Sequence, residues 1–207
     1  MLSQKEHDLK RANLINGGVR AVAEYGLENT STRLISELAG SNEAYIYRYF
    51  NSKEDLLAQA FAEGDTRFLN VILKNFPVLH YNSIDYESRC NLLFQRCWNY
   101  IMSCPTRVIF YIRYYYSSSF QKYAYADHME RFAVLIEKMR SAFPEAVDVG
   151  AILHYMLDTL LGLAMHQISN PQPDPEQVAK RNFQMLFSVV RTYIKPEKIT
   201  RPWEEKR

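Results

Sequence analysis

The sequence predicts an all-α protein of about nine helices, with a small N-terminal helical domain followed by a larger helical one. Along most of the 207 residues, apolar side chains recur at spacings of three and four, which is the period of one helix face. No stretch shows the strict alternation of a half-buried strand. Short runs containing Gly, Pro, Asn or Ser separate the helical segments, and these residues begin or end helices.

Composition restricts the class of protein. A hydrophobic content of 47% with 23% charged residues is typical of a globular chain, and the net charge of +2 indicates no particular partner. The sequence has no apolar run of 18 residues or more, so we expect no membrane span. No apolar segment follows the N-terminal charges, so we expect no secretory signal and a cytosolic location. Phosphate-binding Gly loops, GxSxG, HExxH and CxxC motifs are all missing. We therefore expect no enzyme activity, no cofactor and no metal site.

Residues 30–53 predict two short helices joined by a tight turn. Helical apolar spacing stops at Gly40, a residue that can take the left-handed conformation needed at a helix end. Ser41 and Asn42 can then cap a second helix over residues 43–50. Helix, Gly-containing turn and helix form the helix-turn-helix found in DNA-binding proteins.

The run from Gly26 to Leu57 resembles the N-terminal signature of TetR-type (TetR/AcrR) bacterial transcriptional regulators. The resemblance covers about residues 8–68, with the helix-turn-helix at 31–50. The chain departs from the family pattern at Ser41, where a small apolar residue is usual, and at Tyr45, where a small residue is usual. The positions that agree are Gly26, Thr30, Ile35, Ala39, Gly40, Ile46, Tyr47, Phe50, Ser52, Lys53, Glu54 and Leu57.

The resemblance implies that double-stranded operator DNA is a partner. Arg48 is the strongest candidate base reader, because a guanidinium matches the O6 and N7 acceptors of guanine. Residues 1–55 carry seven basic and eight acidic side chains, a net charge of −1, so bulk charge does not support DNA binding and the motif does. The predicted DNA-contacting residues are Thr32, Arg33, Asn42, Glu43, Ala44, Tyr45, Tyr47, Arg48, Tyr49 and Lys53.

The helix pattern divides the chain into four parts. Residues 1–52 form the helix-turn-helix domain, residues 53–76 a connector helix, and residues 195–207 a flexible tail. Residues 77–194 form a second helical domain, to which the resemblance assigns ligand binding and dimerisation. The other helices are expected over residues 4–25, from about 83 to 104, and over 106–116, 121–142 and 144–169. A last helix is expected to start at residue 175 and to carry apolar residues as far as 190.

The predicted helix over residues 144–169 is apolar on nearly all faces, so it needs two buried sides. A fully buried central helix would satisfy this pattern. The resemblance instead implies that this helix and the last one form a four-helix interface in a homodimer. The residues assigned to that interface are Tyr155, Leu160, Leu163, Phe183, Leu186, Phe187 and Val190.

The resemblance also implies a small-molecule effector in the C-terminal domain, of unknown identity. Residues 108–125 are rich in tyrosine, which supplies both apolar surface and polar tips. An aromatic stripe of this kind can equally be ordinary core. The predicted pocket residues are Phe94, Tyr111, Tyr114, Tyr115, His154 and Asp158.

Cys90, Cys97 and Cys104 follow one another at intervals of seven residues, so a single helix would place them on one face with about 10 Å between one cysteine and the next. That separation excludes a disulfide between any two of them. They are expected to be buried thiols that act as small hydrophobes, with a thiol-based sensor as the alternative.

The resemblance therefore implies a ligand-responsive transcriptional regulator. The favoured form is a repressor that binds a palindromic operator as a dimer and is released by the effector. Two alternatives stay open: an activator, and a TetR-like dimer that has lost operator binding and acts through protein contacts.

Overall fold

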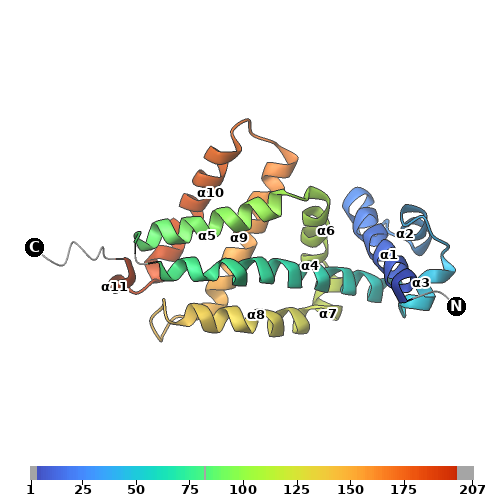
Figure 1. Cartoon of the computed structure of the whole chain (residues 1–207), viewed down its shortest axis with the longest axis horizontal. Helices are drawn as coiled ribbons and strands as arrows, with labels where there is room; N and C mark the ends of the chain where they lie inside the picture. The colour runs from blue at the N-terminus through green and yellow to red at the C-terminus, as the bar shows by residue number, and fades with distance from the viewer. Residues whose placement is uncertain (1–3, 82, 200–207) are drawn as a thin grey trace, which may run out of the picture. The chain divides into compact units, whose positions relative to one another are not determined.

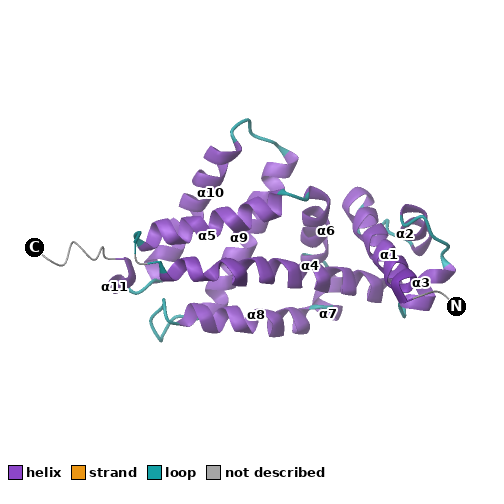
Figure 2. Ribbon diagram, in the orientation of Figure 1, coloured by secondary structure: helices purple, strands orange, loops and turns teal. Residues whose placement is uncertain are grey.

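The structure, a computed structural model, describes residues 4–81 and 83–199. Within these residues the chain consists of helices joined by loops, without a strand (Figure 2), which confirms the all-α prediction. Along the colour ramp of Figure 1 the helices are α1 (Gln4–Tyr25), α2 (Thr32–Leu38), α3 (Ala44–Tyr49), α4 (Lys53–Asn75), the 3-10 helix η1 (Phe76–His80), α5 (Tyr86–Met102), α6 (Pro105–Tyr115), α7 (Ser118–Tyr123), α8 (Tyr125–Arg140), α9 (Val149–Ser169), α10 (Pro175–Val190), the 3-10 helix η2 (Arg191–Tyr193) and α11 (Pro196–Ile199).

The chain divides into two compact units. Unit 1 comprises the residues up to Arg67 together with Cys104–Glu130, and unit 2 comprises Phe68–Ser103 and the residues from Arg131 onward. Unit 1 thus includes α6 and α7, which lie outside the predicted N-terminal domain of residues 1–52. The helices α4 and α8 each begin in unit 1 and continue into unit 2.

Unit 1 has one hydrophobic core, to which α1, the helix-turn-helix, α4, α6 and α7 all contribute. The helix α1 packs against α2 and α6. Two glycines let α1 approach closely, because a Cβ at Gly17 would lie 2.5 Å from the carbonyl oxygen of Ile35, and one at Gly18 would lie 2.7 Å from a methyl group of Leu56. Glycine is unfavourable inside a helix, and here these two glycines serve the packing of α1.

A buried polar cluster joins three helices of unit 1. The hydroxyl of Tyr111 on α6 donates to the carboxylate of Asp65 on α4 at 2.8 Å. Nδ1 of His128 on α8 lies 3.0 Å from both oxygens of the same carboxylate. Asp65 and His128 are 0% and 1% exposed, and the ring of Phe61 lies 4.6 Å from that of Tyr111. The cluster is thus a polar centre inside aromatic core.

In unit 2, α9 and α10 pack against each other and against α5, which also contacts η1 and α11. By length and composition alone α9 could cross a membrane, a finding that the sequence prediction of no span did not anticipate. Helices in the cores of folded domains often meet the same criterion, so this carries little weight. Leu153, Leu157 and Leu161 on α9 are each 4% exposed.

Three predicted helix boundaries need correction. Residues 121–142 form α7 and α8, because Ala124 (φ −134°, ψ −17°) leaves the helical conformation. The helix predicted from residue 144 begins at Val149, since the side chain of Asp148 caps it by accepting from the amide of Ala151 at 3.0 Å. Cys104 lies at the start of α6, so α5 carries only Cys90 and Cys97.

The predicted tail starts at residue 195. Its first part contains α11, which begins at Pro196. Just before this helix, the amide of Lys195 donates to the carbonyl oxygen of Ala142 at 2.9 Å. Residues 200–207 lie outside the described part of the chain.

Candidate functional site

The turn between α2 and α3 has the geometry that the sequence predicts. Gly40 has φ +59°, in the left-handed region that favours glycine. The side chain of Asn42 accepts from the amide of Ala44 at 2.9 Å and so caps α3. At the start of α2, the hydroxyl of Ser31 accepts from the amide of Leu34 at 3.1 Å. Local capping therefore sets the N-terminus of each of the two helices.

The helix α3 is anchored by one face and presents the other to solvent. Ile46 and Phe50 are buried in the core of unit 1, at 0% and 3% exposed. Tyr47 is 63% exposed, and Arg48 is also exposed. Of the other predicted contact residues, Asn42, Glu43 and Ala44 are exposed, whereas Tyr45 and Tyr49 are half-buried.

The N-terminal turns of α1 pack beside α3. The ammonium of Lys10 lies 4.3 Å from the ring centroid of Tyr45, a cation–π contact. The ring of His7 lies 4.5 Å from that of Tyr49. The bulky Tyr45 therefore has a packing partner on α1, and Lys10 brings a positive charge next to α3. Sequence reasoning missed Lys10 because no local pattern links α1 to α3.

The remaining predicted DNA contacts are engaged within the protein. The hydroxyl of Thr32 bonds the carboxylate of Glu43, and Arg33 pairs with Glu37 at 3.0 Å on the exposed face of α2. The ammonium of Lys53 donates to the carbonyl of Thr30 at 3.0 Å. Lys53 thus ties the start of α4 to the segment before α2, and its phosphate contact stays a prediction.

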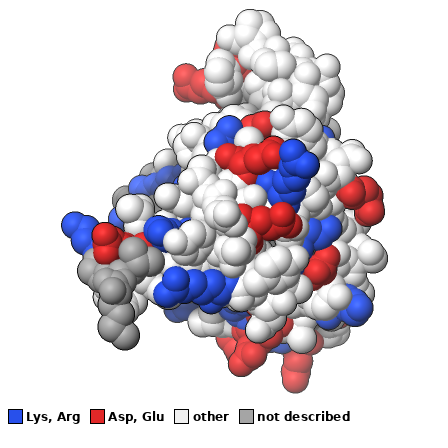
Figure 3. Space-filling view, turned by 90° about the vertical axis from the view of Figure 1, so that its right-hand side faces the viewer, with Lys and Arg blue, Asp and Glu red and all other residues white. Residues whose placement is uncertain are grey.

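Charge is mixed on the face that carries the N-terminal helices. Figure 3 shows Lys and Arg side chains interspersed with Asp and Glu, without a broad field of one sign. This agrees with the even balance of basic and acidic residues in the N-terminal segment. Any phosphate contacts must therefore come from a few well-placed groups.

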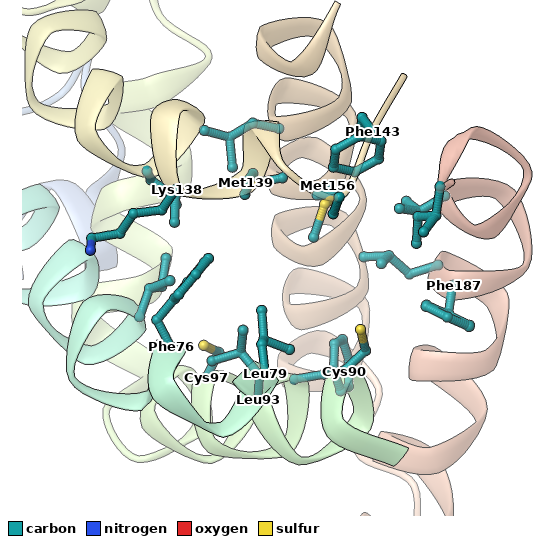
Figure 4. A pocket seen from close by; sticks show the side chains of 18 of the residues that line it. Phe76, Leu79, Cys90, Leu93, Cys97, Lys138, Met139, Phe143, Met156 and Phe187 are labelled. Carbon is teal, nitrogen blue, oxygen red and sulfur yellow. The ribbon is translucent and has the colours of Figure 1, made fainter. Parts of the chain in front are cut away.

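Unit 2 contains an apolar cavity of about 180 Å³. Its wall is made by α4, η1, α5, α8, α9 and α10, with a contribution from the segment that follows α10. Figure 4 shows the side chains of Leu93, Met139, Met156 and Phe187 arranged around an open centre. The aliphatic and aromatic lining is typical of a site for an apolar small molecule.

Of the predicted pocket residues, only Phe94 lines this cavity. Tyr111, Tyr114 and Tyr115 instead pack in or against the core of unit 1. His154 is half-buried, with Nδ1 2.9 Å from the carbonyl oxygen of Gly150. Asp158 is exposed on α9. The tyrosine-rich segment is thus mainly core, which was the alternative interpretation of the sequence.

The predicted dimer residues also lie differently from the expectation. Five of them are between 4% and 7% exposed, because they face the core and cavity of their own protomer. These five are Leu160, Phe183, Leu186, Phe187 and Val190. The solvent-facing side of α9 and α10 carries Tyr155, Met185 and Val189, at 37%, 55% and 41% exposed. Helical periodicity identified two faces and did not show which one turns inward.

Cys90 and Cys97 lie in the cavity wall, and burial raises the pKa of each thiol to about 12. Relative to a thiol of pKa 9.0, the thiolate fraction at pH 8 falls roughly a thousandfold, because each pKa unit is a factor of ten. We expect both thiols to react slowly with iodoacetamide at pH 8, and the rate to rise steadily up to about pH 12. Peptide mapping of the alkylated native chain measures this, with the urea-unfolded chain as control. Rapid labelling of native Cys97 would instead support a thiol sensor.

An exposed recognition helix in one compact helical unit, together with an internal cavity in the other, defines a two-part helix-turn-helix protein. Residues 14–60 match the family described as bacterial regulatory proteins, tetR family. This match bears out the resemblance that the sequence signature predicts for the N-terminal part of the chain.

Several known proteins are similar to this chain in sequence or in structure. The HTH-type transcriptional repressor AcnR of Corynebacterium diphtheriae is 28% identical over 75 residues, a match that spans 36% of this chain and 40% of that protein. A TetR family transcription regulator from Marinobacter aquaeolei VT8 has a TM-score of 0.73 at 19% identity, over 89% of this chain and 97% of that one. The transcriptional regulator FadR of Bacillus subtilis, solved in complex with stearoyl-CoA, has a TM-score of 0.64 at 19% identity, over 86% and 97%. At these identities the solved structures show a shared fold.

Proposed function

We propose that the protein is a transcriptional repressor that acts in the cytosol and binds operator DNA through α3. The observation that carries the proposal is the exposed face of α3, with Tyr47 and Arg48, on a helix-turn-helix that matches the TetR family. The similarity to a protein described as a repressor supports repression over activation. Neither the sequence motifs nor the cavity supports catalysis.

The proposed active form is a homodimer. One short recognition helix reads few base pairs, and a two-fold pair reads a palindrome with half-sites about 34–36 Å apart. The exposed apolar side chains of Tyr155, Met185 and Val189 on α9 and α10 provide the surface for a symmetric contact. This replaces the buried residues that the sequence pattern suggested for the interface.

The proposed effector is an apolar small molecule bound in the cavity of unit 2. A similar protein, FadR of Bacillus subtilis, was solved with stearoyl-CoA, which supports a ligand with a long apolar chain. Phe68 and Ile72 of α4 line the cavity, and the same helix contributes Leu56 and Phe61 to the core of unit 1. A ligand that favours one position of α4 would shift the dimer away from the form that binds DNA.

Arg48→Ala tests whether α3 reads the operator. If Arg48 contacts a base, the substitution weakens binding by about 1–3 kcal/mol and relaxes preference at one or two base positions. The measurement is a gel shift with the promoter region upstream of the gene and single-base variants of it. Arg107→Ala, which removes an exposed arginine of α6 rather than α3, is the matched control.

Other outcomes separate the alternatives. A uniform loss across all sequences would make Arg48 a phosphate contact. The absence of any salt-sensitive, sequence-dependent shift at the promoters tested would favour a dimer that acts through protein contacts. If binding occurs but transcription rises with it, the protein is an activator.

A further inference from the structure

The charged side chains in the cavity wall are all of one sign. Lys138 and Lys198 line it, together with His80, and among the described residues of the wall there is no Asp or Glu. The other ionisable groups there are neutral near pH 7, because burial raises the pKa of Tyr86 well above its usual value and that of Cys90 and Cys97 to about 12. A cationic ligand would thus find no carboxylate in this wall to offset its loss of water.

Two of the basic groups gather around one aromatic ring. The ammonium of Lys138 lies 6.0 Å from the ring centroid of Phe76, and the ring of His80 lies 6.3 Å from the same ring. Lys138 and His80 are exposed although they line the cavity, so they mark a place where it meets solvent. Figure 4 shows the nitrogen of Lys138 at one edge, away from the apolar centre. Within the described part of the chain, Lys138 forms no ion pair.

We propose that the cavity binds a single-chain amphiphile whose apolar chain lies among α5, α8, α9 and α10 and whose anionic head lies beside Lys138 and His80. The proposal rests on the ligand-responsive function proposed above and names the chemical class of the ligand. The head is either a free carboxylate or the phosphate groups of an acyl thioester, because both place negative charge at the end of an apolar chain. A lysine attracts either one, as a compact point charge.

The test compares three ligands with the same chain and different heads: dodecanoate, its methyl ester and dodecyltrimethylammonium. Binding to the full chain is followed by tryptophan fluorescence in a Trp203→Phe background, which leaves Trp98 as the single tryptophan. Trp98 is 3% exposed and stacks on Phe94 of the cavity wall at 5.9 Å. We expect dodecanoate to bind about five- to tenfold more tightly than the ester, as for a partly solvated charge pair, and the ammonium to bind weakest.

Lys138→Gln is expected to remove most of the preference for dodecanoate and to leave the affinity for the ester unchanged. The control is Lys74→Gln, an exposed lysine of α4 that does not line the cavity. The proposal is overturned if the ester or the ammonium binds as tightly as dodecanoate, if none of the three binds, or if the two lysine variants behave alike. Tighter binding of dodecanoyl-CoA than of dodecanoate would assign the head to the thioester source.

A gel shift separates this proposal from the regulatory one. If dodecanoate binds with the expected preference and operator affinity does not change, the ligand response fails and the ligand class stands. If a neutral or cationic ligand releases the operator and the anionic ligands do not, the ligand class fails and the regulatory function stands.

Discussion

Asp65→Ala is expected to lower the free energy of unfolding by about 3–5 kcal/mol, the cost of removing one partner from a buried, hydrogen-bonded polar pair. The carboxylate of Asp65 is 0% exposed and is shared by the hydroxyl of Tyr111 and by Nδ1 of His128. Without it, these donors of α6 and α8 lose the acceptor on α4 that holds the three helices together. Urea unfolding followed by circular dichroism measures the loss.

Two further variants in the cluster are expected to have smaller effects than Asp65→Ala, and a third variant, on the surface, is the control. Asp65→Asn keeps the size and one acceptor oxygen, so its loss should be clearly smaller. Tyr111→Phe removes only the 2.8 Å hydrogen bond and is expected to cost about 1 kcal/mol. Glu37→Ala removes half of an exposed ion pair and should change stability by less than about 0.5 kcal/mol. If Asp65→Ala matched that surface variant, the polar cluster would not stabilise the fold.

Gly17→Ala is expected to destabilise the protein by about 1–3 kcal/mol, the usual cost of overpacking a core, although alanine is the better helix former by about 1 kcal/mol. The added Cβ would lie 2.5 Å from the carbonyl oxygen of Ile35 and 2.9 Å from the Cβ of Ala39. Because the closest atom belongs to the backbone of α2, the helix itself has to shift. Thermal unfolding gives the stability, and a gel shift reports weaker operator binding as α2 and the turn move.

Gly64→Ala is the matched control for Gly17. Gly64 also lies inside a helix of unit 1, but its added Cβ would be 3.5 Å from a ring carbon of Tyr111, an ordinary contact. The substitution should be neutral or stabilising by up to about 1 kcal/mol. Equal stability of the two variants would show that α1 and α2 are not closely packed at Gly17.

The features that the sequence predicts well depend on local interactions. The turn at Gly40 and the cap on α3 by Asn42 each involve residues within a few positions of one another. The pattern of spacing and caps also places both ends of α1 and α4, and the start of α10, within about two residues. The TetR resemblance covers the helix-turn-helix and the start of α4, because its signature consists of turn and core positions there.

The structure departs from the sequence predictions for the pocket and the interface, because both depend on which helices pack against each other. The sequence predicts that residues 108–125 contribute to a ligand pocket, yet Tyr111, Tyr114 and Tyr115 pack in or against the core of unit 1. The resemblance assigned Phe187 to a dimer interface, yet Phe187 lines the cavity of its own chain. Lys10 shows no local sign of its contact with Tyr45. In each case helical spacing shows which residues share a face, without indicating the neighbour of that face.

The sequence by itself thus determined the all-α class and the helix-turn-helix, since propensity, capping and period are properties of a short segment. Only the tertiary structure decided the position of the apolar cavity, the basic groups at its edge and the polar centre formed by Asp65 and His128. The wall of the cavity is made by residues that are more than a hundred positions apart in the sequence, and Asp65 and His128 are also far apart. Their contacts form when helices pack, and packing depends on shape and volume across the whole fold.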